Sequence, residues 1–162
     1  MIDIILGIGH LAASNTPHTQ IKTYALGSCV AIILLCPRMR SVGMVHVALA
    51  EAQINPGKAA TLPGYFADTG LPALLKEMGL LTGRLGPAEL YAKITGGASL
   101  IGTNDTFNIG QRNIRKIKEL LAGSGIRLVA EDVGGTISRT VAVATNTGEV
   151  EISSPGRPNW KL

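Results

Sequence analysis

Apolar residues in this chain gather mainly into short continuous runs, which are typical of β-strands. The two strongest runs cover residues 29–35 and 42–49, and a turn at residues 37–40 separates them. Because polar residues seldom interrupt these runs, we expect strands that are buried on both faces. Weaker runs predict strands at residues 3–8, 22 onwards, 90–95 and 126–133, and a hairpin of 136–145 with 149–153. Residues 10–20 lack such a run and are predicted to form a loop.

Two stretches show helical spacing instead. Apolar residues recur every three or four positions up to Met78, and Gly79 is the predicted C-cap. A second helix is expected from Asn108, as its N-cap, to Ala122. These elements predict a mixed α/β fold that is rich in antiparallel pairing. We expect one domain over residues 1–154 and a loose C-terminal tail over 155–162.

Composition narrows the class of protein. With 162 residues, 46% of them hydrophobic and 16% charged, the chain is long enough for one domain with a sizeable core. The net charge of +4 is spread along the chain with few aromatic residues nearby, which does not favour nucleic-acid binding. No apolar run approaches the ~20 residues that would span a membrane. The N-terminal run carries no basic leader and predicts a strand, not a signal peptide.

The two cysteines differ in their surroundings. Cys29 and Cys36 are seven residues apart, so on one strand they would face opposite ways and could not form a disulfide. Two thiols without a disulfide framework favour a reducing compartment, the cytoplasm. Cys36 precedes a proline at a turn and has no chemical partner nearby, which indicates a structural role.

Cys29 follows a turn of small residues, Gly27 and Ser28, and His46 lies in the next apolar run. If the intervening hairpin is centred near Arg38, Cys29 falls opposite or nearly opposite His46. An imidazole there would activate the thiol and later protonate a leaving amine. Backbone N–H groups of Gly27, Ser28 and Cys29 would stabilise the oxyanion that forms, and the Thr23 hydroxyl would orient the imidazole.

A structural explanation competes with this catalytic one. A cysteine on an apolar strand is usually a packed small residue, and a buried histidine usually a hydrogen-bonded core residue. His10 and His18 have no neighbours at metal-ligand spacing, so we expect no metal site. We also expect no cofactor, because the thiol and the imidazole would carry the chemical steps. The pairs Gly96-Gly97 and Gly134-Gly135 either line a site or only turn the chain, and their spacing does not distinguish these roles.

Several segments together resemble the CheD family of chemoreceptor glutamine deamidases. They cover nearly the whole chain and read, in order, TYALGSCVAIILLCPRMRSVGMVHVAL, GYFADTGLPALLKEM, AKITGGAS, NIGQRN and AEDVGGTISRTV. That family resembles the catalytic domain of cytotoxic necrotizing factor toxins. The resemblance therefore implies a mixed, largely antiparallel β sandwich flanked by helices, with a Cys-His pair.

The resemblance also implies roles. Cys29 corresponds to the nucleophile, His46 to the base and Thr23 to the third catalytic residue. The implied reaction converts glutamines of methyl-accepting chemoreceptors to glutamates, and the implied second partner is a CheC-type phosphatase. Two departures from the family pattern lie where substrate is expected to dock: Ala48-Leu49-Ala50 lacks the usual Leu-Pro pair, and His10 follows Gly9 where glutamate is common.

Two other functions fit the same residues. A binding module would hold a receptor or a CheC-type phosphatase without needing catalysis. A small-molecule amidase would release ammonia from free glutamine in a closed pocket.

Overall fold

Two five-stranded sheets packed face to face form the centre of the molecule in the computed structural model, which describes residues 1–83, 86–100 and 107–162. Sheet A has the order β1 (Ile2–Leu6), β3 (Thr19–Leu26), β8 (Arg139–Ala144), β9 (Val150–Ser153) and β10 (Trp160–Lys161). Sheet B has the order β2 (Leu11–Ser14), β5 (Ser41–Val47), β4 (Val30–Cys36), β6 (Tyr91–Gly96) and β7 (Arg127–Val133).

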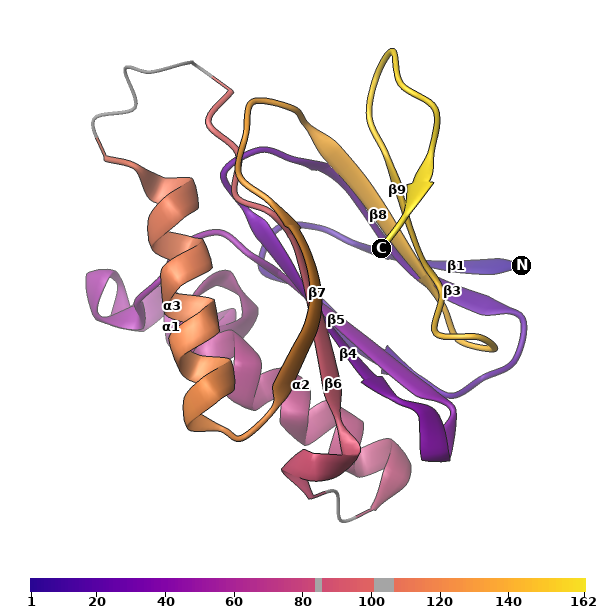
Figure 1. The fold of residues 1–162 in the computed structure, drawn as a ribbon. Coiled ribbons are helices and arrows are strands. Elements are labelled where there is room, and N and C mark those ends of the chain that lie inside the picture. Colours follow the sequence, from indigo (N-terminus) through magenta and orange to yellow (C-terminus); the bar gives the residue numbers. More distant parts are fainter. Residues whose placement is uncertain (84–85, 101–106) are drawn as a thin grey trace.

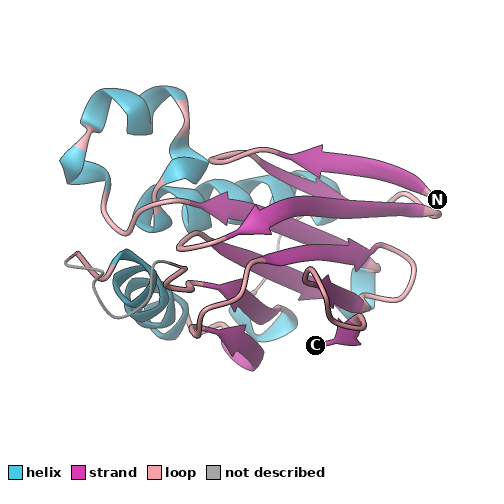
Figure 2. Ribbon diagram, turned by 90° about the horizontal axis from the view of Figure 1, so that it is seen from above, coloured by secondary structure: helices cyan, strands magenta, loops and turns pink. Residues whose placement is uncertain are grey.

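Helices α2 (Ala67–Thr82) and α3 (Ile109–Gly123) cover the outer face of sheet B (Figure 1). The chain also forms the short helix α1 (Pro56–Thr61), which has no buried residue, and 3-10 turns at Pro37–Met39, Ala52–Ile54, Pro63–Tyr65 and Pro87–Glu89. Both ends of the chain lie away from α3 (Figures 1 and 2). In the described ranges, no helix is long and apolar enough to cross a membrane.

The central strands of sheet B, β4 and β5, are buried on both faces, as their continuous apolar runs predict. One face packs on α2 and α3 through Val30, Ile32 and Leu34. The other packs on sheet A through Ala31 and Ile33. The pairs β1–β3 and β6–β7 are parallel and the remaining pairs are antiparallel. The predicted mixed, largely antiparallel sandwich flanked by helices is therefore confirmed.

The hairpin of β4 and β5 carries both candidate catalytic segments. Its turn is the 3-10 segment Pro37–Met39, closed by Arg40 with a φ of 48°. This turn sets the register, in which Cys36 pairs with Ser41 and Ala31 pairs with His46. His46 and the side chains in phase with it face sheet A, so the interior between the sheets receives the imidazole.

Two predicted elements differ from the structure. Residues 11–14, expected to be a loop, form β2 as an edge strand paired only with β5. Helix α2 does not end at Met78 but continues through Gly79 to Thr82, where Gly83 has a φ of 77°. The helix continues because Gly79 does not adopt a positive φ, whereas Gly83 does and so takes the conformation that ends a helix.

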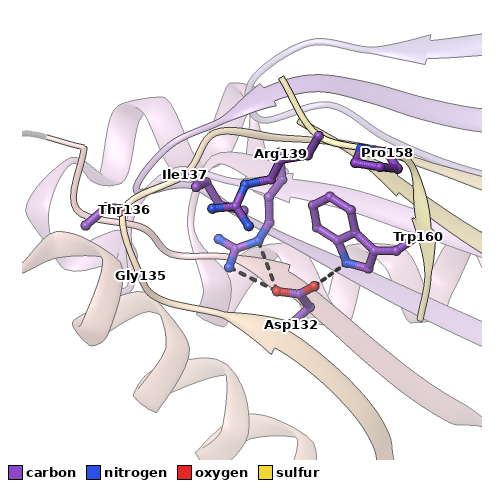
Figure 3. A pocket seen from close by; sticks show the side chains of 8 residues that line it. Asp132, Gly135, Thr136, Ile137, Arg139, Pro158 and Trp160 are labelled. Carbon is purple, nitrogen blue, oxygen red and sulfur yellow. Dashed lines mark hydrogen bonds and ion pairs between the residues drawn. The ribbon is translucent and has the colours of Figure 1, made fainter. Parts of the chain in front are cut away.

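The C-terminal residues are not a loose tail, which corrects the expectation for 155–162. Residues 160 and 161 form β10 and pair with Ile152 and Glu151 of β9. The Trp160 indole N–H donates to Asp132, and the same carboxylate accepts two hydrogen bonds from the guanidinium of Arg139 (Figure 3). A hydrogen-bonded, partly buried indole next to paired strands anchors this segment to the body of the protein.

Candidate active site

A hydrogen bond between the two sheets connects Thr23 to His46. Thr23 lies on β3 and His46 on β5, and both side chains are buried where the sheets face each other. Thr23 Oγ1 is 2.7 Å from His46 Nδ1, and it also donates to the carbonyl of Leu6 at 2.8 Å. The predicted contact between this hydroxyl and this imidazole is therefore present, although the two residues come from different sheets.

These two bonds determine the imidazole tautomer. A hydroxyl has one hydrogen, and the Leu6 carbonyl can only accept, so that hydrogen points to Leu6. Thr23 Oγ1 must then accept from His46, which requires the proton on Nδ1. The other nitrogen, Nε2, is left with its lone pair. It is buried and has no hydrogen-bond partner among the described residues, so it can receive a proton from a nearby acid.

Burial keeps this imidazole neutral. Removal from water, and to a lesser degree the charge of His10, lower the pKa of His46 from 6.5 to about 4. At neutral pH the imidazole is therefore a base that has not yet taken its proton.

We expect the His46 resonance in an NMR pH titration to have its midpoint near pH 4 rather than 6.5. Since the unfolded chain binds this proton more readily than the folded one, stability should also decrease as the pH falls from 6.5 towards 4. Loss of the resonance in His46→Asn confirms its assignment. A midpoint at or above 6.5 would show that the imidazole is not desolvated.

Cys29 lies in the short connection between β3 of sheet A and β4 of sheet B. Cys29 was predicted to fall opposite or nearly opposite His46; the residue paired with His46 is Ala31, so Cys29 is displaced from the opposite position by two residues. Because an even displacement keeps the same face, Cys29 still borders the apolar cluster between the sheets. In a regular ladder such diagonal neighbours lie about 7–8 Å apart. The thiol and Nε2 share no hydrogen bond in this structure.

The Cys29 thiol is also neutral in the free protein. Burial raises its pKa, and its own backbone N–H opposes this rise in part. A neutral thiol beside a neutral imidazole becomes a thiolate only when a proton is transferred, so reactivity depends on their approach. Cys36 faces the helices on the other side of the sheet, as the odd spacing predicts, and both cysteines are free thiols.

The segment Gly27–Cys29, here called the nucleophile loop, is held by backbone hydrogen bonds. Gly97 N–H donates to the Cys29 carbonyl and Ala98 N–H to the Gly27 carbonyl, both at 2.8 Å. A Cβ on Gly96, which has a φ of 115°, would lie 2.2 Å from the Cys29 carbonyl oxygen. The Gly96-Gly97 pair, whose role the sequence left open, therefore contacts the nucleophile loop directly.

Sequence reasoning missed a second contact with this loop. The Asn113 side chain, on α3, is fully buried and donates to the carbonyls of Ser28 and Ala48, each at 3.0 Å. Asn113 belongs to the NIGQRN segment, which marked it only as part of the family resemblance. Nothing in the spacing of residues 28, 48 and 113 indicates that they meet.

A groove of about 610 Å³ adjoins this region. Asn113 forms part of its wall, so the groove begins where α3 contacts the nucleophile loop. Ile54 and Phe107 line it and are 70% and 67% exposed. Basic side chains on α3 line the same groove, namely Arg112, Arg115 and Lys116. In the described part of the chain, no cluster of His, Cys, Asp and Glu is suited to hold a metal ion.

Comparisons with known proteins all point to one family. A family model described as CheD chemotactic sensory transduction matches residues 48–154. A Syntrophotalea carbinolica protein named "Probable chemoreceptor glutamine deamidase CheD" is 49% identical over the full length of both chains. A Syntrophus aciditrophicus protein named "Probable chemoreceptor glutamine deamidase CheD 1" is 35% identical over the same span. The "Chemoreceptor glutamine deamidase CheD" of Thermotoga maritima is 36% identical over 94% of this chain and 92% of its own.

Proposed function

We propose, from the premise that this chain belongs to the CheD family, that it is a protein-glutamine deamidase acting on methyl-accepting chemoreceptors in bacterial chemotaxis. The substrate is a glutamine side chain on the cytoplasmic domain of a receptor, and the products are a glutamate side chain and ammonia. The enzyme works in the cytoplasm and uses protein groups alone.

In the proposed reaction, His46 Nε2 takes the thiol proton and the Cys29 sulfur attacks the amide carbon. The tetrahedral intermediate collapses as the imidazolium returns its proton to the leaving nitrogen, so the C–N bond breaks and ammonia departs. Water, activated by the same imidazole, then attacks the thioester. This step releases the carboxylate and restores the thiol.

One observation carries the assignment of the base. The Thr23 hydroxyl donates to Leu6 and therefore accepts from His46 Nδ1, which leaves Nε2 unprotonated and without a partner. A core histidine that only stabilised the fold would be expected to have both ring nitrogens satisfied. The buried, unpaired lone pair on His46 Nε2 therefore favours the role of a base that accepts a proton from the thiol. The family-model match begins at residue 48, so the roles of Cys29, His46 and Thr23 rest on this geometry and on the resemblance.

The groove favours a protein substrate over a free amino acid. Exposed apolar side chains at Ile54 and Phe107 would pack on a helix surface. Three basic side chains of α3 line the groove against two acidic ones, Glu51 and Glu119, and the excess of positive charge suits a helix surface that carries negative charge. We propose that the receptor helix lies in this groove. A CheC-type phosphatase is the second proposed partner, on the family resemblance alone, and its binding should persist when Cys29 is replaced.

Ammonia release measured with a receptor cytoplasmic fragment and with free glutamine tests the proposed substrate. We expect turnover of the fragment, accompanied by the small mass increase of converting NH2 to OH, and negligible turnover of the amino acid. Equal turnover of free glutamine would favour the small-molecule amidase, and no turnover of either would favour the binding module.

Phe107→Ser tests the docking surface. We expect KM for the receptor fragment to rise about tenfold, because an exposed aromatic side chain at an interface typically contributes about 1–2 kcal/mol, and kcat to change little. Leu80→Ser is the matched control, since Leu80 is 71% exposed and lies on α2 outside the groove lining. An unchanged KM in Phe107→Ser would place the receptor elsewhere.

A further inference from the structure

Asn113 connects three segments that surround the candidate site. It lies in the second turn of α3, and its side-chain nitrogen Nδ2 donates to the carbonyl of Ser28 and to the carbonyl of Ala48. Ser28 precedes the proposed nucleophile, and Ala48 lies two residues after the proposed base. One buried amide therefore fixes α3, the nucleophile loop and the end of β5 with respect to one another.

The packing of glycines makes this reach possible. A Cβ on Gly110 would lie 2.3 Å from the Gly97 carbonyl oxygen, and a Cβ on Gly97 would lie 2.6 Å from the Ile114 side chain. The first turn of α3 therefore approaches the backbone at Gly97 closely, and Gly97 is the residue that donates to the Cys29 carbonyl.

The chemistry of the two contacts requires an amide nitrogen. Both partners are carbonyl oxygens, which only accept, so the NH2 group must face them. The other end of the amide, Oδ1, is buried without a partner among the described residues. An unsatisfied buried oxygen is costly, and the two hydrogen bonds that Nδ2 donates offset part of that cost.

Peptide planarity converts these contacts into a constraint on the proposed oxyanion donors. In a trans peptide, the carbonyl of one residue and the N–H of the next point in opposite directions. Asn113 holds the Ser28 carbonyl, which orients the Cys29 N–H, and Ala98 holds the Gly27 carbonyl, which orients the Ser28 N–H. Neither of these N–H groups donates to another backbone carbonyl among the described residues.

We propose that Asn113 is a positioning residue that sets the oxyanion hole of this enzyme. By fixing the Ser28–Cys29 peptide plane, its amide directs the Cys29 N–H to the place where negative charge develops on the substrate carbonyl oxygen. This inference rests on the proposed deamidase function and adds to it a buried residue that acts through the nucleophile loop rather than by bonding to the reacting atoms.

The test distinguishes stabilisation of the oxyanion in the transition state from the structural integrity of the nucleophile loop. Attack on an amide builds charge on oxygen, whereas alkylation of a thiol by iodoacetamide displaces iodide and needs no oxyanion donor. Asn113→Asp keeps the shape of the side chain but replaces the donor nitrogen with an acceptor oxygen. We expect kcat on the receptor fragment to fall about 100-fold with KM unchanged. The rate and pH profile of Cys29 alkylation should stay as in the wild type when the donors are removed without adding charge, as in Asn113→Ala.

Two further variants complete the design. Asn113→Ala removes the donors without adding charge, and it should show the same pattern if the aspartate variant fails to fold. Leu121→Ala is the matched control, because Leu121 is buried on α3 and far along the helix from the nucleophile loop. It should lose stability to urea without a change in kcat.

The alternative outcomes are distinct. Equal losses of kcat and of alkylation in both Asn113 variants would mean that Asn113 only maintains the loop. Full kcat in either folded variant would remove it from catalysis altogether. A wild-type protein that shows no Cys29-dependent deamidation would overturn the proposed function itself, and this inference with it.

Discussion

Cys29→Ala is expected to lower the rate of receptor deamidation at least about 10³-fold while leaving the protein folded. In the proposed mechanism the sulfur is the only protein atom that forms a covalent bond to the substrate, and an alanine side chain has no atom that can replace it. Because Cys29 lies in a connection between strands and is only partly buried, the change removes little of the core. Ammonia release and the mass of the receptor fragment measure the loss, and circular dichroism checks the fold.

Cys36→Ala is the matched control for this prediction. Cys36 is fully buried against α2 and α3, so its replacement should cost about 1–2 kcal/mol of stability but leave kcat unaltered. Deamidation that continued in Cys29→Ala and stopped in Cys36→Ala would move the nucleophile to the other face of the sheet.

His46→Asn is expected to lower kcat about 10²–10⁴-fold, the range that general acid–base catalysis usually contributes. Asparagine can still bond to Thr23, so the change removes the proton-accepting nitrogen rather than the contact between the sheets. The Cys29 thiol should also alkylate more slowly at neutral pH, because its own pKa is raised and no base remains to take its proton. Ammonia release from the receptor fragment measures the loss of kcat, and the rate of Cys29 alkylation measures the reactivity of the thiol.

Thr23→Val is the milder variant with which the activity of His46→Asn is compared. It keeps the imidazole and the size of the neighbouring side chain but removes the acceptor that holds the proton on Nδ1. Its activity should therefore lie between that of the wild type and that of His46→Asn. Activity equal to the wild type would show that the tautomer does not depend on Thr23. Wild-type activity in His46→Asn would exclude the imidazole as the base.

The long apolar runs predicted the centre of this fold well, because a strand buried on both faces leaves a clear sequence pattern. The pairing of β4 with β5 followed from their length and from the proline turn between them. The register did not, since it depends on the 3-10 turn and on the left-handed conformation of Arg40. The error was an even number of residues, so it moved Cys29 along the strand but kept it on the face shared with His46.

Elements that depend on distant partners could not be predicted. β2 is four residues of modest hydrophobicity, and only its pairing with β5 makes it a strand. β10 has two residues, and its position depends on β9 and on the bond from Trp160 to Asp132. Local periodicity contains no information about either contact.

The same limit applied to the site. The Thr23 hydroxyl was predicted to orient the imidazole, but the sequence did not show that it does so from another sheet, since β3 ends at Leu26 and belongs to sheet A. The hydroxyl still reaches the imidazole because the two sheets face each other. Asn113 could be identified only once the helix was placed against the nucleophile loop, since its partners lie 85 and 65 residues away in sequence.

Rapid acid quenching of the enzyme during turnover of a receptor fragment, followed by mass spectrometry, shows whether a thioester forms on Cys29. We predict a fraction of enzyme heavier by one fragment less one ammonia, with the added mass on the peptide that contains Cys29. The account would be contradicted by an adduct on any other residue, or by undiminished ammonia release from protein whose Cys29 had been alkylated beforehand.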